Sequence, residues 1–210
     1  MKKFEFALVT TRNGDTGKSS TFDGCVQSKD SEVFQAVGAI DELSSYLGLI
    51  RNVIVENPIR GPRNMIARAR ARQELLRIQK ELQTGMSLVA TDPQFDKKHT
   101  PTNELYLTLV QLELSHIESL EKWQKRILSS EVTIATQFVP PGATAESAYV
   151  DIARAVCRRA ERNIVQFMNT KERYDLKYVS MYLNRLSDVL FILARWLEQN
   201  PSYKKPLFKF

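Results

Sequence analysis

Helical periodicity is the sequence feature that most constrains the fold of this chain. Apolar residues recur at three- and four-residue steps through five long segments, and proline or glycine stands between most of them. Each segment therefore has one apolar face, which a folded chain must bury against another element. No stretch has the pattern of a central β-strand. The sequence predicts an all-α fold, a five-helix bundle.

The predicted bundle is a single domain over residues 31–200. It follows a loop-rich N-terminal arm (1–30), which has a short strand at 4–9, and precedes a C-terminal tail (201–210). Helices are expected at about 31–55, at 64–90, from Pro101 past Leu120, from Thr144 past Phe167, and at 177–199. The residues expected to face the core are Val33, Val37, Ile40, Leu43, Leu47 and Ile50; Leu75, Ile78, Leu82 and Val89; Leu107, Val110, Leu114, Ile117 and Leu120; Val150, Ala153, Cys157, Ala160, Ile164 and Phe167; and Val179, Tyr182, Leu186, Val189, Leu193 and Leu197.

Charge and composition narrow the class of partner. The net charge of +6 over 210 residues favours anions in general. A run of arginines lacks interleaved aromatic residues, so we interpret it as a solvated helix face and expect no nucleic-acid partner; it comprises Arg60, Arg63, Arg68, Arg70 and Arg72. No apolar stretch approaches the roughly 20 residues of a membrane span. We expect a cytoplasmic protein with no membrane partner.

Cysteine and histidine are sparse and isolated. Cys25 and Cys157 lie far apart, as do His99 and His116, and none of these residues has zinc-site spacing. The pattern predicts a reduced protein with no metal held by its own side chains.

A glycine-rich stretch in the arm has the composition of a phosphate-binding loop. Glycines let backbone N–H groups turn toward an anion, and lysine and hydroxyl side chains add further donors. Gly17-Lys18-Ser19 matches the end of a P-loop, but Arg12 stands where that motif needs glycine and no helix follows directly. The alternatives are a flexible solvated arm and a P-loop phosphotransferase. The residues concerned are Thr11, Arg12, Gly14, Asp15, Gly17, Lys18, Ser19 and Ser20.

Two further polar groups lie on predicted helices. One is a stripe at helical spacing on the fourth helix: Asp151, Arg154, Arg158, Glu161 and Arg162. Its arginines suit a triphosphate, although surface ion pairs explain the spacing equally well. The other group stands beside the apolar face of the fifth helix: Asn184, Arg185 and Asp188. Inter-helix hydrogen bonding is the alternative there, and a bundle that binds no nucleotide remains open at this point.

Five blocks in this order resemble the PduO-type ATP:cob(I)alamin adenosyltransferases. They begin with the stretch from Thr11 to Phe22 and continue with Ala36-Val-Gly-Ala-Ile-Asp-Glu-Leu-Ser-Ser45, Phe138-Val-Pro-Pro-Gly142, Arg154-Ala-Val-Cys-Arg-Arg-Ala-Glu-Arg162 and Tyr182-Leu-Asn-Arg-Leu-Ser-Asp188. Each block is moderately specific, and the ordered set is highly specific. The resemblance implies a ferritin-like, cobalamin adenosyltransferase-like bundle, assembled as a homotrimer with active sites at subunit interfaces.

The resemblance also implies roles for residues. The arm from Gly14 to Ser20 is expected to hold the triphosphate of ATP with Mg²⁺, and Lys29 to approach phosphate. Arg158 and Glu161 are expected in the nucleotide site and Asn184 at the adenosine. Asp41 and Arg154 match a pair that bridges subunits, and Phe138 matches the aromatic residue below the corrin, a site to which we also assign Asp188.

The implied reaction transfers the 5′-deoxyadenosyl group of ATP to the cobalt of cob(I)alamin and releases triphosphate. A corrinoid reductase and a B12-dependent mutase are the implied functional partners. Val150 and Asp151 stand where this family usually has Leu-His. That departure supports one alternative, an ATP-binding regulatory homologue without corrinoid turnover.

Overall fold

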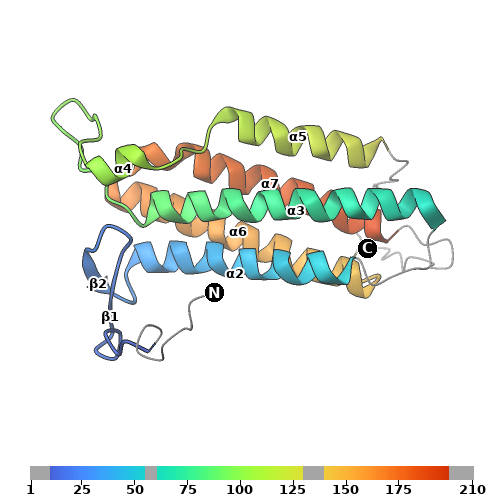
Figure 1. Cartoon of the computed structure of the whole chain (residues 1–210), viewed down its shortest axis with the longest axis horizontal. Helices are drawn as coiled ribbons and strands as arrows, with labels where there is room; N and C mark the ends of the chain where they lie inside the picture. Colours follow the sequence, from blue (N-terminus) through green and yellow to red (C-terminus); the bar gives the residue numbers. More distant parts are fainter. Residues whose placement is uncertain (1–9, 55–60, 130–139, 199–210) are drawn as a thin grey trace, which may run out of the picture.

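Five helices run side by side along one long axis, which confirms the predicted all-α bundle (Figure 1). The computed structural model describes residues 10–54, 61–129 and 140–198. The bundle helices are α2 (Glu32–Val53), α3 (Gly61–Val89), α5 (Leu114–Leu128), α6 (Ala145–Lys171) and α7 (Lys177–Leu197). A short helix, α4 (Glu104–Thr108), a 3-10 turn, η1 (Tyr174–Leu176), and two short strands, β1 (Lys18–Ser20) and β2 (Val26–Ser28), lie at one end. The strand expected at 4–9 falls outside the described residues.

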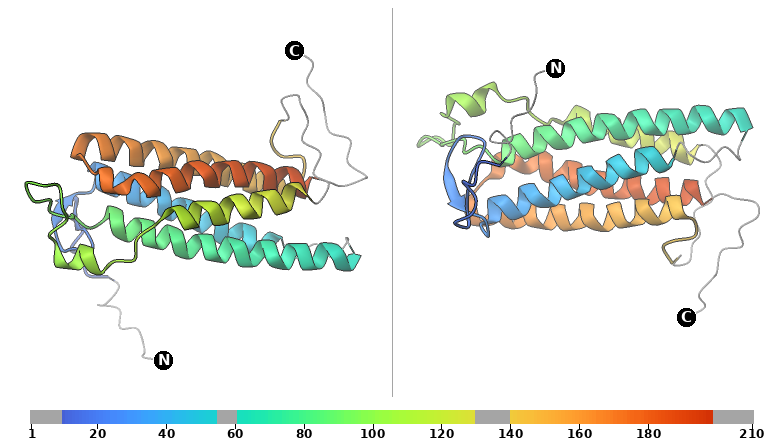
Figure 2. Two further views of the ribbon diagram at one scale, coloured as in Figure 1. Left: turned by 90° about the horizontal axis from the view of Figure 1, so that it is seen from above. Right: turned by 60° about the horizontal axis from the view of Figure 1, so that its bottom comes forward.

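Helix α6 is central to the packing. It lies against α2 on one side and α7 on the other, while α3 packs on α2 and α5 packs on α7 (Figure 2). All six predicted core positions of α6, from Val150 to Phe167, are buried, and so are all six of α7. Helix α6 begins near Thr144, as predicted, and the Thr144 hydroxyl caps it by accepting a hydrogen bond from the Ser147 amide. Glu172, with a positive φ of 53°, ends it.

The prediction of one continuous third helix from Pro101 past Leu120 is wrong. The chain forms α4, then an extended segment, then α5. Leu107, Val110 and Leu114, which were expected in the core, are 61%, 71% and 50% exposed, whereas Tyr106 and Leu112 are buried. Glu113 starts a new helix, because its amide donates to His116 Nδ1 and its side chain accepts from the His116 amide. This local cap overrides the apolar periodicity that continues through it.

The interpretation of the arginine run as a solvated face is wrong for Arg68. Its guanidinium donates two hydrogen bonds to the Glu146 carboxylate, at 2.6 and 2.9 Å, and one to the Ile54 carbonyl. Both side chains are only 7% exposed. Arg70 and Arg72 are exposed, as expected. The bidentate pair fastens the start of α3 to the start of α6.

Two other expectations concern membrane-spanning helices and the state of the cysteines. In the described part of the chain, no helix is both long and apolar enough to cross a membrane. Cys25 is exposed and Cys157 is buried, and neither forms a disulfide. The Cys157 thiol donates to the Leu183 carbonyl across the α6–α7 contact, and burial raises the pKa of that thiol.

Candidate active site

The glycine-rich arm forms a small antiparallel hairpin. Lys18 pairs with Ser28, Ser19 with Gln27 and Ser20 with Val26. Before β1, the chain turns tightly, with the Asp15 amide donating to the Arg12 carbonyl and the Gly17 amide to the Gly14 carbonyl. Gly17 has a φ of +78°, a conformation that glycine adopts without strain. A hairpin follows the loop where a P-loop would have a helix, so the P-loop alternative loses its structural context.

Lys29 lies directly over this turn. Its amide donates to the Gly17 carbonyl at 2.9 Å. A Cβ on Gly14 would lie 2.6 Å from Lys29 Nζ, so the missing side chain is what admits the ammonium group. Lys18 and Ser20 are exposed beside it. The arm thus presents two lysines and several hydroxyl groups, which suit a polyphosphate.

The hairpin is docked on the end of α3. The Phe22 amide donates to the Ala90 carbonyl at 3.0 Å, and the Asp92 amide donates to Asp23 Oδ2 at 2.9 Å. Partial burial acts to raise the pKa of Asp23, but hydrogen bonds from Asp92, Thr21 and Cys25 outweigh it and lower that pKa below the ordinary value. Sequence reasoning missed Asp23 as the anchor of the arm; the only local signal is the turn-type pattern Thr21-Phe22-Asp23-Gly24.

The polar groups of α6 and α7 meet at one point. Asn184 Nδ2 donates to Glu161 Oε1 at 2.8 Å, so the structure brings these two predicted ATP residues together. Arg158 is exposed about one turn before Glu161 on α6. Asp188 is held by Arg185 at 2.8 Å, and Arg185 also contacts Glu121 of α5 at 2.9 Å. Asn184 thus links α7 to α6, whereas Arg185 links α7 to α5.

The arm and the α6 stripe do not meet within one chain. Residues Thr170 and Lys171, at the end of α6, line a cavity of about 640 Å³ with Asp23 of the arm. Arg158 lies about 20 Å before that end, at 1.5 Å per helical residue. The two halves of the predicted nucleotide site are therefore separated along α6.

Asp41 belongs with the arm end of the bundle. It is exposed and lines a groove of about 400 Å³ with Phe22 of the arm and Met86 of α3. The ion pair recorded for Arg154 is with Asp151 of its own helix, at 3.4 Å. Glu42, next to Asp41, pairs with Arg159 instead. The exposed Asp41 carboxylate remains accessible to a second molecule.

Asp151 does not belong to the solvated stripe, contrary to the sequence interpretation. It is 5% exposed and accepts a hydrogen bond of 2.5 Å from Arg195 of α7. Arg195 also pairs with Glu198, at 2.7 Å. Val150 is fully buried. The residues that replace the usual Leu-His are thus part of the bundle interior. Sequence spacing gave no sign of Arg195, because only the fold brings α7 to this point.

Phe138 lies outside the described residues. Within the described segments, no group of three or more His, Cys, Asp or Glu side chains could hold a metal ion. Mg²⁺ fits a different donor set: an ion bound to ATP phosphates and water needs few protein ligands, and the arm's hydroxyl oxygens suit it.

Comparison with known proteins gives a consistent result. The family model for cobalamin adenosyltransferase matches residues 9–197. A corrinoid adenosyltransferase, MMAB, from Bos taurus is 39% identical over 202 residues, covering 94% of this chain and 76% of the relative. A corrinoid adenosyltransferase from Bacillus subtilis is 32% identical over 188 residues, covering 88% of this chain and 83% of that protein.

Solved structures agree with the sequence comparisons. A variant PduO-type ATP:corrinoid adenosyltransferase from Lactobacillus reuteri, solved with cobalamin and ATP, superposes with a TM-score of 0.74 at 26% identity. The match covers 96% of this chain and 99% of that one. A second variant of the PduO-type enzyme from that organism, solved with ATP, gives a TM-score of 0.72 over the same shares.

Proposed function

The chain belongs to the cobalamin adenosyltransferase family and is an ATP-dependent corrinoid adenosyltransferase, and from this premise we propose which of its residues bind ATP and which bind the corrinoid. The single observation that carries the proposal is the docked arm. Its turn at residues 12–17, with Lys29 above it, supplies the donors that a triphosphate needs. In the proposed site the triphosphate rests on Gly14, Gly17, Lys18, Ser19 and Ser20, with Thr11, Arg12 and Asp15 in the turn that precedes them.

The other half of the nucleotide site comes from a neighbouring subunit in this proposal. Along α6, Arg158 lies about 20 Å and Glu161 about 15 Å from the end that meets the arm, and Asn184 of α7 is bonded to Glu161, so one chain cannot close both halves around one ATP. The exposed Asp41 carboxylate beside the arm is free to meet Arg154 of another copy. A homotrimer with three interface sites satisfies both observations. In it Arg158 faces the triphosphate, while the Glu161–Asn184 pair faces the adenosine.

On the corrinoid side we propose Phe138 as the aromatic residue below the corrin, with Asp188 nearby. Asp151 does not enter that site, because Arg195 holds its carboxylate in the interior. The change from the usual Leu-His is therefore accommodated inside the bundle. This finding weakens the alternative of a regulatory homologue, since that departure was its support.

The proposed chemistry needs alignment and charge stabilisation more than proton transfer. The lone pair of cob(I) forms the Co–C bond with C5′ of ATP while the C5′–O bond breaks, and triphosphate leaves with that electron pair. No general base takes part. Lys18, Lys29 and Arg158 stabilise the departing charge, and the interface holds cobalt and carbon in line. Mg²⁺, when bound, neutralises part of the phosphate charge.

We further propose a cytoplasmic setting, in which a corrinoid reductase supplies the reduced substrate and a B12-dependent mutase uses the product. The reductase follows from the chemistry, since cobalt must be reduced to cob(I) before it can attack carbon.

An anaerobic assay with ATP, Mg²⁺ and cob(I)alamin tests the proposal. We expect light-sensitive adenosylcobalamin and an equal amount of triphosphate. Formation of ADP or phosphate in place of triphosphate would contradict the leaving group. Tight ATP binding without adenosylcobalamin would favour the regulatory alternative.

A further inference from the structure

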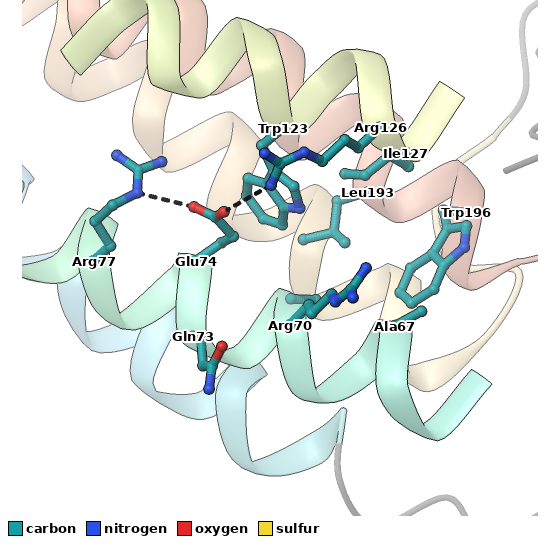
Figure 3. A pocket seen from close by; sticks show the side chains of 11 residues that line it. Ala67, Arg70, Gln73, Glu74, Arg77, Trp123, Arg126, Ile127, Leu193 and Trp196 are labelled. Carbon is teal, nitrogen blue, oxygen red and sulfur yellow. Dashed lines mark hydrogen bonds and ion pairs between the residues drawn. The ribbon is translucent and has the colours of Figure 1, made fainter. Parts of the chain in front are cut away.

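A further cavity opens between α3, α5 and α7 (Figure 3). Its volume is about 520 Å³, within the range of small-molecule sites. Trp123 of α5 and Trp196 of α7 form part of its wall, with an apolar floor of Ala67, Ala71, Ile127 and Leu193. Among the described residues, none of those proposed for the ATP or corrinoid site lines it.

The cavity lies far from the arm of the same chain. Arg70, which lines it, stands twenty residues before Ala90, whose carbonyl holds the arm through Phe22. At 1.5 Å per residue, the two points are about 30 Å apart along α3. A ligand in this cavity would therefore be distinct from an ATP bound on the same chain's arm.

The rim of the cavity carries excess positive charge. Arg77 is already paired with Glu74 and Glu81, at 2.9 and 2.7 Å. Arg126 is 72% exposed and stands 3.9 Å from Glu74, too far for a hydrogen bond (Figure 3). Arg70 is exposed, and among the described residues no ion pair is recorded for it. Arg70 therefore remains available to an anion, and Arg126 has only its long, exposed ion pair with Glu74 to exchange for one.

We propose that this cavity binds a flat aromatic group that carries a phosphate. The indole rings and apolar floor suit a planar base, and Arg70 and Arg126 suit phosphate oxygens. Two sources supply this chemistry. One is a free nucleoside monophosphate. The other is the lower nucleotide of a cobalamin, a benzimidazole ribose phosphate, and this second source rests on the proposed function.

The chain offers a direct probe, because its two tryptophans both line the cavity. Both are labelled as 5-fluorotryptophan, and ¹⁹F NMR follows the full-length protein with saturating Mg²⁺ and ATP. AMP and dimethylbenzimidazole ribose phosphate are added in turn. We expect one of them to shift both signals saturably, and Arg70→Ala to weaken its binding at least about fivefold. Arg72→Ala is the matched control, since Arg72 is an exposed arginine of α3 that does not line the cavity.

Three results would overturn the proposal: no saturable shift with either compound, equal weakening in Arg72→Ala, or signals that move on protein dilution without ligand, which would make the cavity a subunit interface. The titration needs no turnover, so an enzyme without adenosyltransfer would still report on the cavity.

Steady-state kinetics separate the two sources. If the lower nucleotide binds here, Arg70→Ala raises KM for cobalamin several-fold and leaves KM for cobinamide, which lacks that nucleotide, unchanged. If a free nucleotide binds here, neither KM changes while the AMP shift is lost. Equal increases of both KM values would place Arg70 in contact with the corrin and contradict the proposal.

Discussion

Asp151 of α6 and Arg195 of α7 form an ion pair at 2.5 Å inside the bundle, with side chains 4% and 2% exposed. Glu198 pairs with the same guanidinium, and Arg154 approaches Asp151 from the surface. The pair therefore links the α6–α7 contact to a residue proposed for the subunit interface. A buried charge that loses its partner destabilises a fold far more than an exposed one.

Asp151→Asn is expected to lower the free energy of unfolding by about 3 kcal/mol, because Arg195 loses one of its two carboxylate partners. Urea denaturation measures the change. Asp188→Asn is the matched control, because its pair with Arg185 is 48% exposed on the carboxylate side and should contribute less than about 1 kcal/mol. Asp151→His, which restores the residue usual in the family, should destabilise similarly. Equal stabilities of Asp151→Asn and the control would show that the buried pair carries no net stabilisation.

Arg158→Ala is expected to reduce kcat/KM by at least about 10²-fold, since one donor to the leaving group is removed. Unfolding free energy should stay within about 0.5 kcal/mol, because Arg158 is exposed. Steady-state kinetics check the expected fall in kcat/KM, and denaturation checks the free energy of unfolding, with Arg72→Ala as the control in both. Wild-type turnover in Arg158→Ala would remove this residue from the nucleotide site.

Asp23→Asn is expected to loosen the arm and raise KM for ATP several-fold, because the Asp92 amide loses a charged acceptor. Hydrogen exchange of the Asp92 amide reports docking directly. Asp30→Asn is the control, as an exposed carboxylate beside the same arm. Faster exchange without a change in KM would separate arm docking from ATP binding.

Low pH should also release the arm, because protonation of Asp23 removes the charged acceptor of the Asp92 amide. The pKa of Asp23 is lowered on folding, so its stabilising contribution is fully present above the unfolded value of 3.8 and is lost as pH falls through the lower folded value. Near neutral pH, docking should not change with pH, because Asp23 stays ionised there. Exchange of the Asp92 amide, corrected for intrinsic rates, should accelerate only below about pH 4 in the wild type and be insensitive to that range in Asp23→Asn. An unchanged acid transition in the variant would assign it to another group.

Phe138→Ala is expected to reduce activity from cob(II)alamin, with a reductant present, more than activity from chemically prepared cob(I)alamin. An apolar ring below the corrin excludes water and the lower base from cobalt, and that exclusion matters before reduction. Parallel assays from the two oxidation states check this. Equal losses would remove the ligand-exclusion role.

Gly14→Ala is expected to weaken ATP binding, because the new methyl group would lie 2.6 Å from Lys29 Nζ and displace the ammonium from the turn. Gly38→Ala is the control, since an added Cβ there meets nothing within 4 Å. ATP titration by calorimetry measures both. Unchanged affinity in Gly14→Ala would show that Lys29 does not need this approach.

The sequence by itself determined the helices whose apolar faces repeat without interruption. For α6 and α7, the apolar period runs unbroken through the helix, so every predicted core position is buried. The loop-rich character of the arm was likewise predicted from composition, and the structure gives it only two three-residue strands, while its binding of phosphate stays a prediction. Periodicity failed between α4 and α5, where the Glu113–His116 cap interrupts an apolar pattern that continues on both sides.

Only the tertiary structure decided which charges are buried. Arg68 and Asp151 have the same local pattern as exposed residues, and their partners, Glu146 and Arg195, lie 78 and 44 residues away. The same holds for Asp23, whose bond to Asp92 spans 69 residues. Helical spacing specifies the face of a helix on which a side chain lies. Which other helix covers that face depends on how the whole chain packs. That packing therefore decides whether burying a charge there raises or lowers the stability of the fold.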